Sequence, residues 1–286
     1  MAASALDSTA LRRQLRNELR KARNGAGLTQ REIADRLEWS TSKVIRIETG
    51  QVAVSTVDLR AMLREYGIHD MGRIEQLVEL ARSSKKQSWS QYRGTLSQAA
   101  MDYFGYEASA YIVRQFESLL VPGLLQTDDY SREVLQRAFP TDESSFERRF
   151  EARKVRQELL ERSDRPQLFF VLDEAVVRRS VGGRDVMLRQ IDHLIELSER
   201  ERVSIQIYPF SAGAYPGMGG PFTQLELPGD EGDVLYFEAR TESVVRDTED
   251  DRADVVRYLE MFQTFENEAT DHSEFLRILE DVKQHL

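Results

Sequence analysis

The chain has 286 residues, long enough for about two domains that each bury a hydrophobic core. It contains no cysteine, which excludes disulfides, thiolate metal sites and cysteine catalysis, and its four histidines show no paired ligand spacing. No run approaches the ~18 apolar residues of a membrane span, and the first residues lack the apolar stretch of a secretory signal. We therefore expect a cytoplasmic protein that does not enter a membrane.

Charge is distributed unevenly along the sequence. The chain carries 39 basic and 49 acidic residues, a net charge of −10. Residues 1–50 hold ten basic and six acidic side chains, so this segment is positive by four and the remainder is negative by fourteen. A basic head on an acidic body can bind a phosphate backbone, although a basic helix face is often only solvated surface.

Five short helices are predicted in the N-terminal part. The first has leucines at every fourth position and begins at Ser8 or Thr9. The second is capped by Thr29, with Glu32 at the spacing of a capping box, and the third is capped by Ser40. The predicted ranges are 8–23, 30–37, 41–48, 56–66 and 72–82.

Residues 27–50 have the pattern of a helix-turn-helix. Two short helices with their own Ser or Thr caps are joined by three to four residues, and their apolar positions can share one core. A helix that reads the major groove needs polar side chains in its first turns and an apolar opposite face. Thr41, Ser42, Lys43 and Arg46 are the predicted exposed positions. A helical hairpin that does not bind DNA is the alternative, which the caps, the spacing and the basic face together disfavour.

The N-terminal segment resembles the Xre type of regulator, with its lambda-repressor and Cro-like helix-turn-helix domain, over about residues 8–82. The matching residues are Gly27, Leu28, Thr29, Gln30, Ile33, Ala34, Ser40, Arg46, Ile47, Glu48 and Gly50. One position departs from the family: Glu38 stands in the turn where a glycine with positive φ is usual. Either Glu38 adopts this conformation or the turn is remodelled.

The resemblance also assigns roles to individual residues. The predicted DNA-binding set is Thr29, Gln30, Ser40, Thr41, Ser42, Lys43 and Arg46. By position, the first two contact phosphate at the start of the second helix, and Lys43 lies near the phosphates. Thr41, Ser42 and Arg46 face base edges. Arg46 is the predicted bidentate partner of a guanine, a contact worth ~1–3 kcal/mol of discrimination.

A polar segment separates this domain, residues 1–82, from the rest of the chain. Residues 83–98 have little apolar periodicity and are predicted to be the linker to a domain at 99–286. Trp89 and Tyr92 within the linker are expected to pack on the following domain.

The second domain is predicted to be mixed α/β. A helix from about Ala99 is expected to include Tyr111 and Ile112. Further helices are predicted at 127–138, 146–162, 184–200 and 248–286, the last broken near Thr270, and strands at 168–172, 204–210, 222–227 and 234–239. The last two strands are expected to form a hairpin. The predicted fold class is multidomain, an all-α helix-turn-helix domain plus a mixed α/β C-terminal domain.

Four features of the second domain have simple structural explanations. The glycine-rich stretch 211–220 lacks the ending of a phosphate loop. The acidic run 247–251 lacks EF-hand spacing and suits a helix start. Asp173 and Glu174 form a carboxylate pair after a strand, without a histidine or cysteine nearby. The arginines of 148–156 alternate with glutamates as on a solvated helix, a second DNA or partner contact being the minor alternative. We therefore predict no catalytic residue, no metal and no cofactor.

Four segments of the second domain resemble the long C-terminal domain of WhiJ-like, Scr-type antitoxin-like actinobacterial transcriptional regulators. They are 121–131, 148–160, 172–183 and 205–228, and the resemblance extends over nearly all of 99–286. It implies an interaction or sensing module. Many members of that family are paired with a small neighbouring protein, so the resemblance also implies such a partner.

Three functional hypotheses follow. The first is a nucleoid-associated, sequence-specific regulator that binds double-stranded DNA as a homodimer and a small protein partner through residues 99–286. The second is the same regulator gated by a small ligand, which needs a large apolar pocket. The third is an enzyme tethered to DNA, which needs titratable groups gathered in a pocket. The acidic C-terminal domain suits a basic partner and favours the first.

Overall fold

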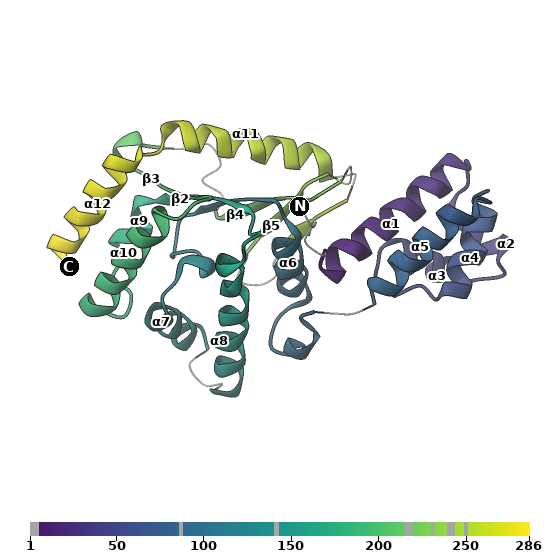
Figure 1. Cartoon of the computed structure of the whole chain (residues 1–286), viewed down its shortest axis with the longest axis horizontal. Coiled ribbons are helices and arrows are strands. Elements are labelled where there is room, and N and C mark those ends of the chain that lie inside the picture. Colours follow the sequence, from purple (N-terminus) through teal and green to yellow (C-terminus); the bar gives the residue numbers. More distant parts are fainter. Residues whose placement is uncertain are drawn as a thin grey trace. The chain divides into compact units, whose positions relative to one another are not determined.

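Two compact units make up the chain, residues 1–90 and residues 91–286 (Figure 1). The computed structural model describes residues 6–85, 88–139, 143–214, 220–229, 232–238, 244–248 and 251–286. Residues 86–87 of the predicted linker, 215–219 and 230–231 of two predicted loops, 239 of the last predicted strand and 249–250 of the last predicted helix lie outside these ranges.

The described part of the N-terminal unit is a bundle of helices. They are α1 (Ser8–Gly25), α2 (Gln30–Arg36), α3 (Thr41–Glu48), α4 (Thr56–Glu65) and α5 (Met71–Ser83). These bounds confirm the five predicted helices. The predicted cap of the first helix is wrong, because Oδ1 of Asp7 accepts the backbone N–H of Thr9 at 2.8 Å and Ser8 lies inside the first turn. An aspartate before a helix satisfies a free N–H and also favours the positive end of the helix dipole.

One apolar face of every helix contributes to a shared core in this unit. The residues at most 1% exposed are Leu19, Ile33, Ala34, Leu59, Met62, Leu63, Leu77, Val78, Ala81 and Val44. Because α2 and α3 are only seven and eight residues long, this burial stabilises them far more than their intrinsic propensity does.

A six-stranded mixed sheet is the centre of the C-terminal unit, with strand order β3-β2-β1-β4-β5-β6. The strands are β1 (Ile112–Glu117), β2 (Gln167–Asp173), β3 (Val203–Tyr208), β4 (Phe222–Glu226), β5 (Val234–Phe237) and β6 (Val244–Arg246). β1, β2 and β3 are parallel, whereas β4, β5 and β6 follow in antiparallel order. The predicted fold class and the predicted hairpin of β4 and β5 are both confirmed.

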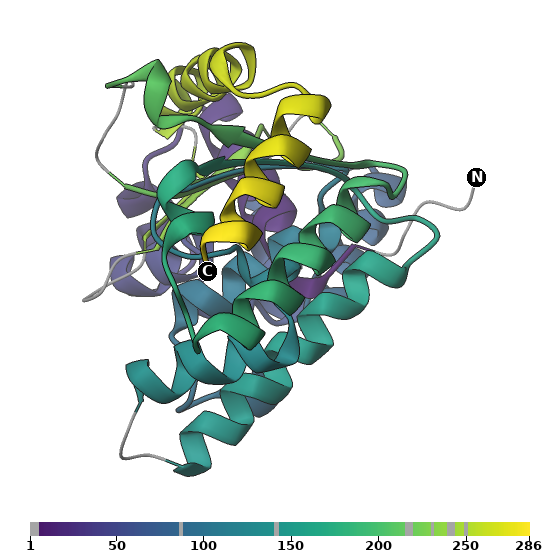
Figure 2. The same cartoon turned by 90° about the vertical axis from the view of Figure 1, so that its left-hand side faces the viewer.

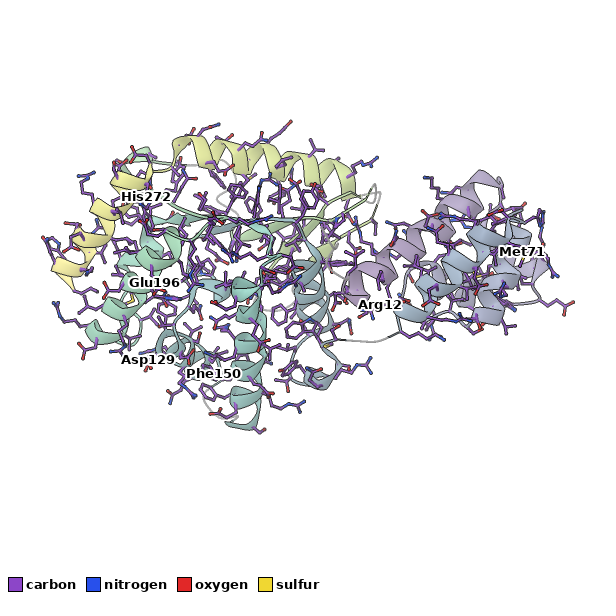
Figure 3. All side chains as sticks on the ribbon, in the orientation of Figure 1. Arg12, Met71, Asp129, Phe150, Glu196 and His272 are labelled. Carbon is purple, nitrogen blue, oxygen red and sulfur yellow. The ribbon has the colours of Figure 1, made fainter. Side chains whose placement is uncertain are left out.

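Helices cover both faces of this sheet. They are α6 (Gln98–Ser109), α7 (Asp128–Ala138), α8 (Glu143–Gln157), α9 (Glu174–Arg178), α10 (Arg184–Ser198), α11 (Arg252–Glu268) and α12 (His272–His285). α11 lies on one face, and α6, α7, α8 and α10 lie on the other (Figures 1 and 2). Aromatic rings join α11 to the sheet, with the ring centroids of Phe116 and Phe265 4.4 Å apart. On the other face Phe150 of α8 is buried (Figure 3).

One short 3-10 turn spans the boundary between the two units, and three lie within the described part of the C-terminal unit. They are η1 (Ser90–Tyr92), η2 (Gly123–Leu125), η3 (Glu158–Glu161) and η4 (Phe210–Ala212). Tyr92, from the predicted linker, is only 2% exposed.

The prediction that Tyr111 and Ile112 belong to a helix is wrong. α6 ends at Ser109, and β1 begins at Ile112 between β2 and β4. Ile112 and Val113 are β-branched and suit a strand, and the order of the sheet places them at its centre. The short strand β6 was also absent from the sequence prediction.

Candidate nucleic-acid interface

The two predicted helix caps lie where the sequence places them. Oγ1 of Thr29 accepts the N–H of Glu32 at 3.2 Å, and Oε2 of Glu32 accepts the N–H of Thr29 at 2.7 Å. This is a complete capping box, and the hydrogen bond from the Thr29 backbone lowers the pKa of Glu32. Oγ of Ser40 accepts the N–H of Lys43 at 3.2 Å and so begins α3. Both helices of the motif therefore have fixed first turns.

Glu38 adopts the left-handed backbone conformation, with φ of +56°. The N–H of Trp39 bonds to the carbonyl of Ala34 at 2.8 Å, and the N–H of Glu38 bonds to the carbonyl of Asp35 at 3.3 Å. These two bonds are the Schellman ending of α2. The turn thus keeps its geometry, and the glutamate takes the conformation in which glycine is usual.

The outer face of α3 presents polar and apolar side chains together. Ser42 and Arg46 are exposed, whereas Val44 is fully buried and Ile47 is 5% exposed. In the described part of the chain Arg46 forms no ion pair, so its guanidinium is available to a ligand. Ile45 is 38% exposed beside Arg46 and was missed by the sequence reasoning. The sequence does contain a signal for the exposure of Ile45, because this residue lies between Val44 and Ile47, which both face the core.

Lys43 is held by two neighbours on the protein. Its Nζ lies 3.5 Å from the ring centroid of Trp39 and 3.2 Å from Oδ1 of Asp58, at the start of α4. A lysine held in this way presents its charge at one place on the surface, in contrast to a freely moving side chain. Thr41, two positions earlier, is half-buried.

Gln30 belongs to a buried network centred on Glu48. Nε2 of Gln30 donates to Oε2 of Glu48 at 2.9 Å, and Nε of Arg23 donates to both oxygens at 2.8 and 3.0 Å. The hydroxyl of Tyr66 donates to Oε1 at 2.9 Å. Burial raises the pKa of Tyr66, and the Glu48 charge adds to this. The sequence reasoning treated Gln30 as a phosphate contact and did not identify this network, which fixes α1, α2 and α3 together.

The two carboxylates at the end of β2 and the start of α9 serve the local fold. Oδ1 of Asp173 accepts the N–H of Ala175 at 2.8 Å and begins α9. Glu174 bonds to Arg178 within that helix and accepts the N–H of Phe210. In the ranges that the structure describes, no three His, Asp or Glu side chains gather as metal ligands. No helix in the same ranges is long and apolar enough to cross a membrane.

Comparison with known proteins gives two matches, one in each unit. Residues 14–81 match a family of helix-turn-helix domains. Residues 100–281 match a domain of unknown function, DUF5753. No curated protein and no solved structure matches the chain. The chain therefore belongs to the DUF5753 family, and it carries a helix-turn-helix domain ahead of the domain that defines this family.

Proposed function

We propose that the chain is a sequence-specific, DNA-binding transcriptional regulator of the Xre type. The observation that supports this most directly is the outer face of α3, where Ser42, Ile45 and Arg46 are exposed and the opposite side is anchored in the core. A helix with this distribution can enter the major groove while the rest of the bundle holds its angle. Arg46 suits a guanine, and Ile45 suits the methyl group of a thymine.

We assign the contacts with the DNA backbone to residues at the starts of α2 and α3. Thr29 is exposed at the start of α2, and Ser40 is exposed at the start of α3. Gln30 keeps the predicted phosphate contact through the second N–H of its side-chain amide, since the first donates to Glu48. Lys43 supplies a fixed positive charge. The net charge of +4 over residues 1–50 favours the approach of this end of the chain to DNA.

We propose that the regulator is cytoplasmic and nucleoid-associated, WhiJ-like and antitoxin-like, and that it acts as a homodimer. A dimer of such motifs binds two half-sites about 34–36 Å apart, or a multiple of that distance. The DUF5753 domain would be an interaction module for a small protein partner and not an enzyme. Asp173 and Glu174 support this assignment, since both carboxylates are occupied in local contacts.

Selection of genomic DNA fragments by the purified full-length protein tests the proposal. We expect one enriched pseudo-palindromic sequence, and sedimentation should show two chains on each duplex. Arg46→Ala should lose preference at one base pair in each half-site. Arg277→Ala is the matched control, because Arg277 is an exposed arginine in the acidic unit. Enrichment of random sequence, or one chain per high-affinity duplex, would reject the proposal.

A further inference from the structure

A buried ion pair lies between α6 and α8, on the face of the sheet opposite α11. Nε and Nη2 of Arg156 donate to the two oxygens of Glu107 at 2.5 and 2.7 Å. Arg156 also donates to the hydroxyl of Tyr103, which in turn donates to Glu107. The prediction of a solvated arginine stripe is wrong for Arg156, whose side chain is only 9% exposed. Its partner lies 49 residues away in sequence, so the local alternation of charge gave no sign of it.

Two further polar side chains lie in the second half of β1, on this same face of the sheet. Gln115 and Glu117 are two residues apart and so point to one side of the sheet. Gln115 is 6% exposed, and its Nε2 donates to Oε1 of Glu117 at 2.8 Å. Its amide oxygen, also buried, has no hydrogen-bond partner in the described part of the protein. A buried acceptor left unpaired is destabilising, so this oxygen needs a donor that the described chain does not supply.

Glu117 has no balancing cation of its own. Within the described ranges it forms no ion pair, while the charge of Arg156 is already neutralised by Glu107. Glu238 follows β5, which runs in the direction of β1, so both carboxylates lie at the same edge of the sheet. Burial raises the pKa of Glu117 to about 8, and the negative charge of Glu238 adds to this. Arg153, which is attracted by the charge of Glu238, donates to the neutral side chain of Gln126 and forms no ion pair with Glu117 in the described structure.

The place of this cluster in the fold is one where ligands bind. The edge is formed by the carboxyl ends of the parallel strands β1, β2 and β3, outside which open α/β sheets bind their ligands. Leu119, two residues beyond Glu117 in sequence, is 57% exposed and offers an apolar side chain where the chain leaves β1.

We propose that this edge of the DUF5753 domain binds a cationic nitrogen group, an ammonium or a guanidinium. The amide oxygen of Gln115 and the carboxyl group of Glu117, which releases its proton when the cation binds, accept its N–H donors. Glu238 supplies further negative charge, and Leu119 contacts the attached carbon chain. The group belongs either to a free small amine or to a lysine or arginine side chain of a partner protein. This site does not depend on the assignment of DNA contacts to α3.

Binding of simple probes to the full-length protein tests the site. Butylammonium supplies the headgroup of a free amine, and lysine or arginine blocked at both backbone ends supplies a side chain. Tetramethylammonium is the control, because it has the same charge and no N–H donor. Calorimetric titration at constant ionic strength should show binding of at least one donor probe and at least tenfold weaker binding of tetramethylammonium. Preference for butylammonium identifies a free amine as the source, and preference for a blocked amino acid identifies a side chain.

Two substitutions separate a binding role from a structural one. Glu117→Gln keeps the shape of the side chain and should weaken the binding of the donor probe at least tenfold. Gln115→Met removes the unpaired oxygen, so binding should fall while the protein unfolds at the same or a higher temperature. Glu260→Gln, at an exposed position on α11, should leave binding unchanged. The proposal fails if no donor probe binds more tightly than tetramethylammonium, or if Glu117→Gln binds as the wild type does.

Discussion

Glu38 shows how one residue can hold a turn at a cost to stability. A side chain in the left-handed region is disfavoured by roughly 1–2 kcal/mol, a penalty that glycine does not have. We predict that Glu38→Gly raises the free energy of unfolding of the N-terminal unit by up to about 1 kcal/mol, the gain being reduced by the greater freedom of glycine in the unfolded chain. Urea unfolding monitored by Trp39 fluorescence measures this change. Glu38→Ala should give little gain, and a loss of stability in Glu38→Gly would contradict this account of the turn.

Arg46 and Lys43 lie on the same helix and should behave differently toward DNA. Arg46 is exposed without an ion pair in the described structure, so Arg46→Ala should cost ~1–3 kcal/mol at one base position. Lys43 is held beside Trp39 and Asp58 and acts as a charge. Lys43→Ala should weaken all sequences alike and flatten the salt dependence of binding by about one unit. Binding assays over a range of salt concentrations, on the selected site and on random DNA, distinguish the two. Identical behaviour of the two variants would refute these roles.

The charge of Glu48 links the helices α1, α2 and α3. Because Glu48 is fully buried against Arg23, Gln30 and Tyr66, removing its charge leaves the Arg23 guanidinium without a counter-charge, with only the Leu28 carbonyl and a neutral amide as acceptors. We predict that Glu48→Gln destabilises the N-terminal unit by about 3 kcal/mol, within the range for breaking one half of a buried pair. Tyr66→Phe removes one hydrogen bond to a charged group and should cost about 1.5 kcal/mol. Thermal unfolding compares the two, and a larger loss in Tyr66→Phe would show that Glu48 is not the centre of the network.

Elements whose signals are local were predictable from sequence, and those defined by distant contacts were not. Thr29 and Ser40 mark the starts of α2 and α3 because a cap acts on backbone groups two or three residues away. β1 was not predicted, and its first residue, Ile112, was assigned to a helix, because the central position of this strand depends on β2 and β4, which follow much later in the chain. In the same way, Arg156 gave no local sign of Glu107, and Gln30 gave none of Glu48.

Two parts of the chain, residues 1–50 and residues 51–286, carry opposite net charges, which affects what each part can bind. The positive segment of residues 1–50 is attracted to DNA, whereas the remainder, with a net charge of −14, is repelled by it. The net negative charge of the remainder disfavours non-specific DNA binding by the DUF5753 domain and suits that domain to cationic groups. The two proposals, DNA at α3 and a cationic nitrogen at the edge of β1, thus follow the same separation of charge.

The stability of the C-terminal unit should fall as pH rises, because Glu117 binds its proton more tightly in the folded state. Its pKa is raised to about 8 by burial and by Glu238, while Arg156 and the hydrogen bond from Gln115 oppose the shift. The unfolded chain releases this proton near pH 4.5. Between about pH 4.5 and 8 the folded state therefore holds more protons than the unfolded state, and its stability decreases by at most ~1.4 kcal/mol per pH unit for this group.

Glu117→Gln has no such proton, so its stability relative to the wild type should increase steadily from about pH 5 to 8 and then level off. Hydrogen exchange of backbone amides in β1, measured by mass spectrometry, reports on the C-terminal unit alone. Glu266 also has a pKa raised by burial, and it remains present in both proteins, so the difference between them isolates Glu117. Glu260→Gln should run parallel to the wild type across this range. If the difference in stability between Glu117→Gln and the wild type stays constant with pH, Glu117 is ionised in the folded protein across this range. The edge of the sheet at the carboxyl end of β1 would then carry its full negative charge before any cation binds.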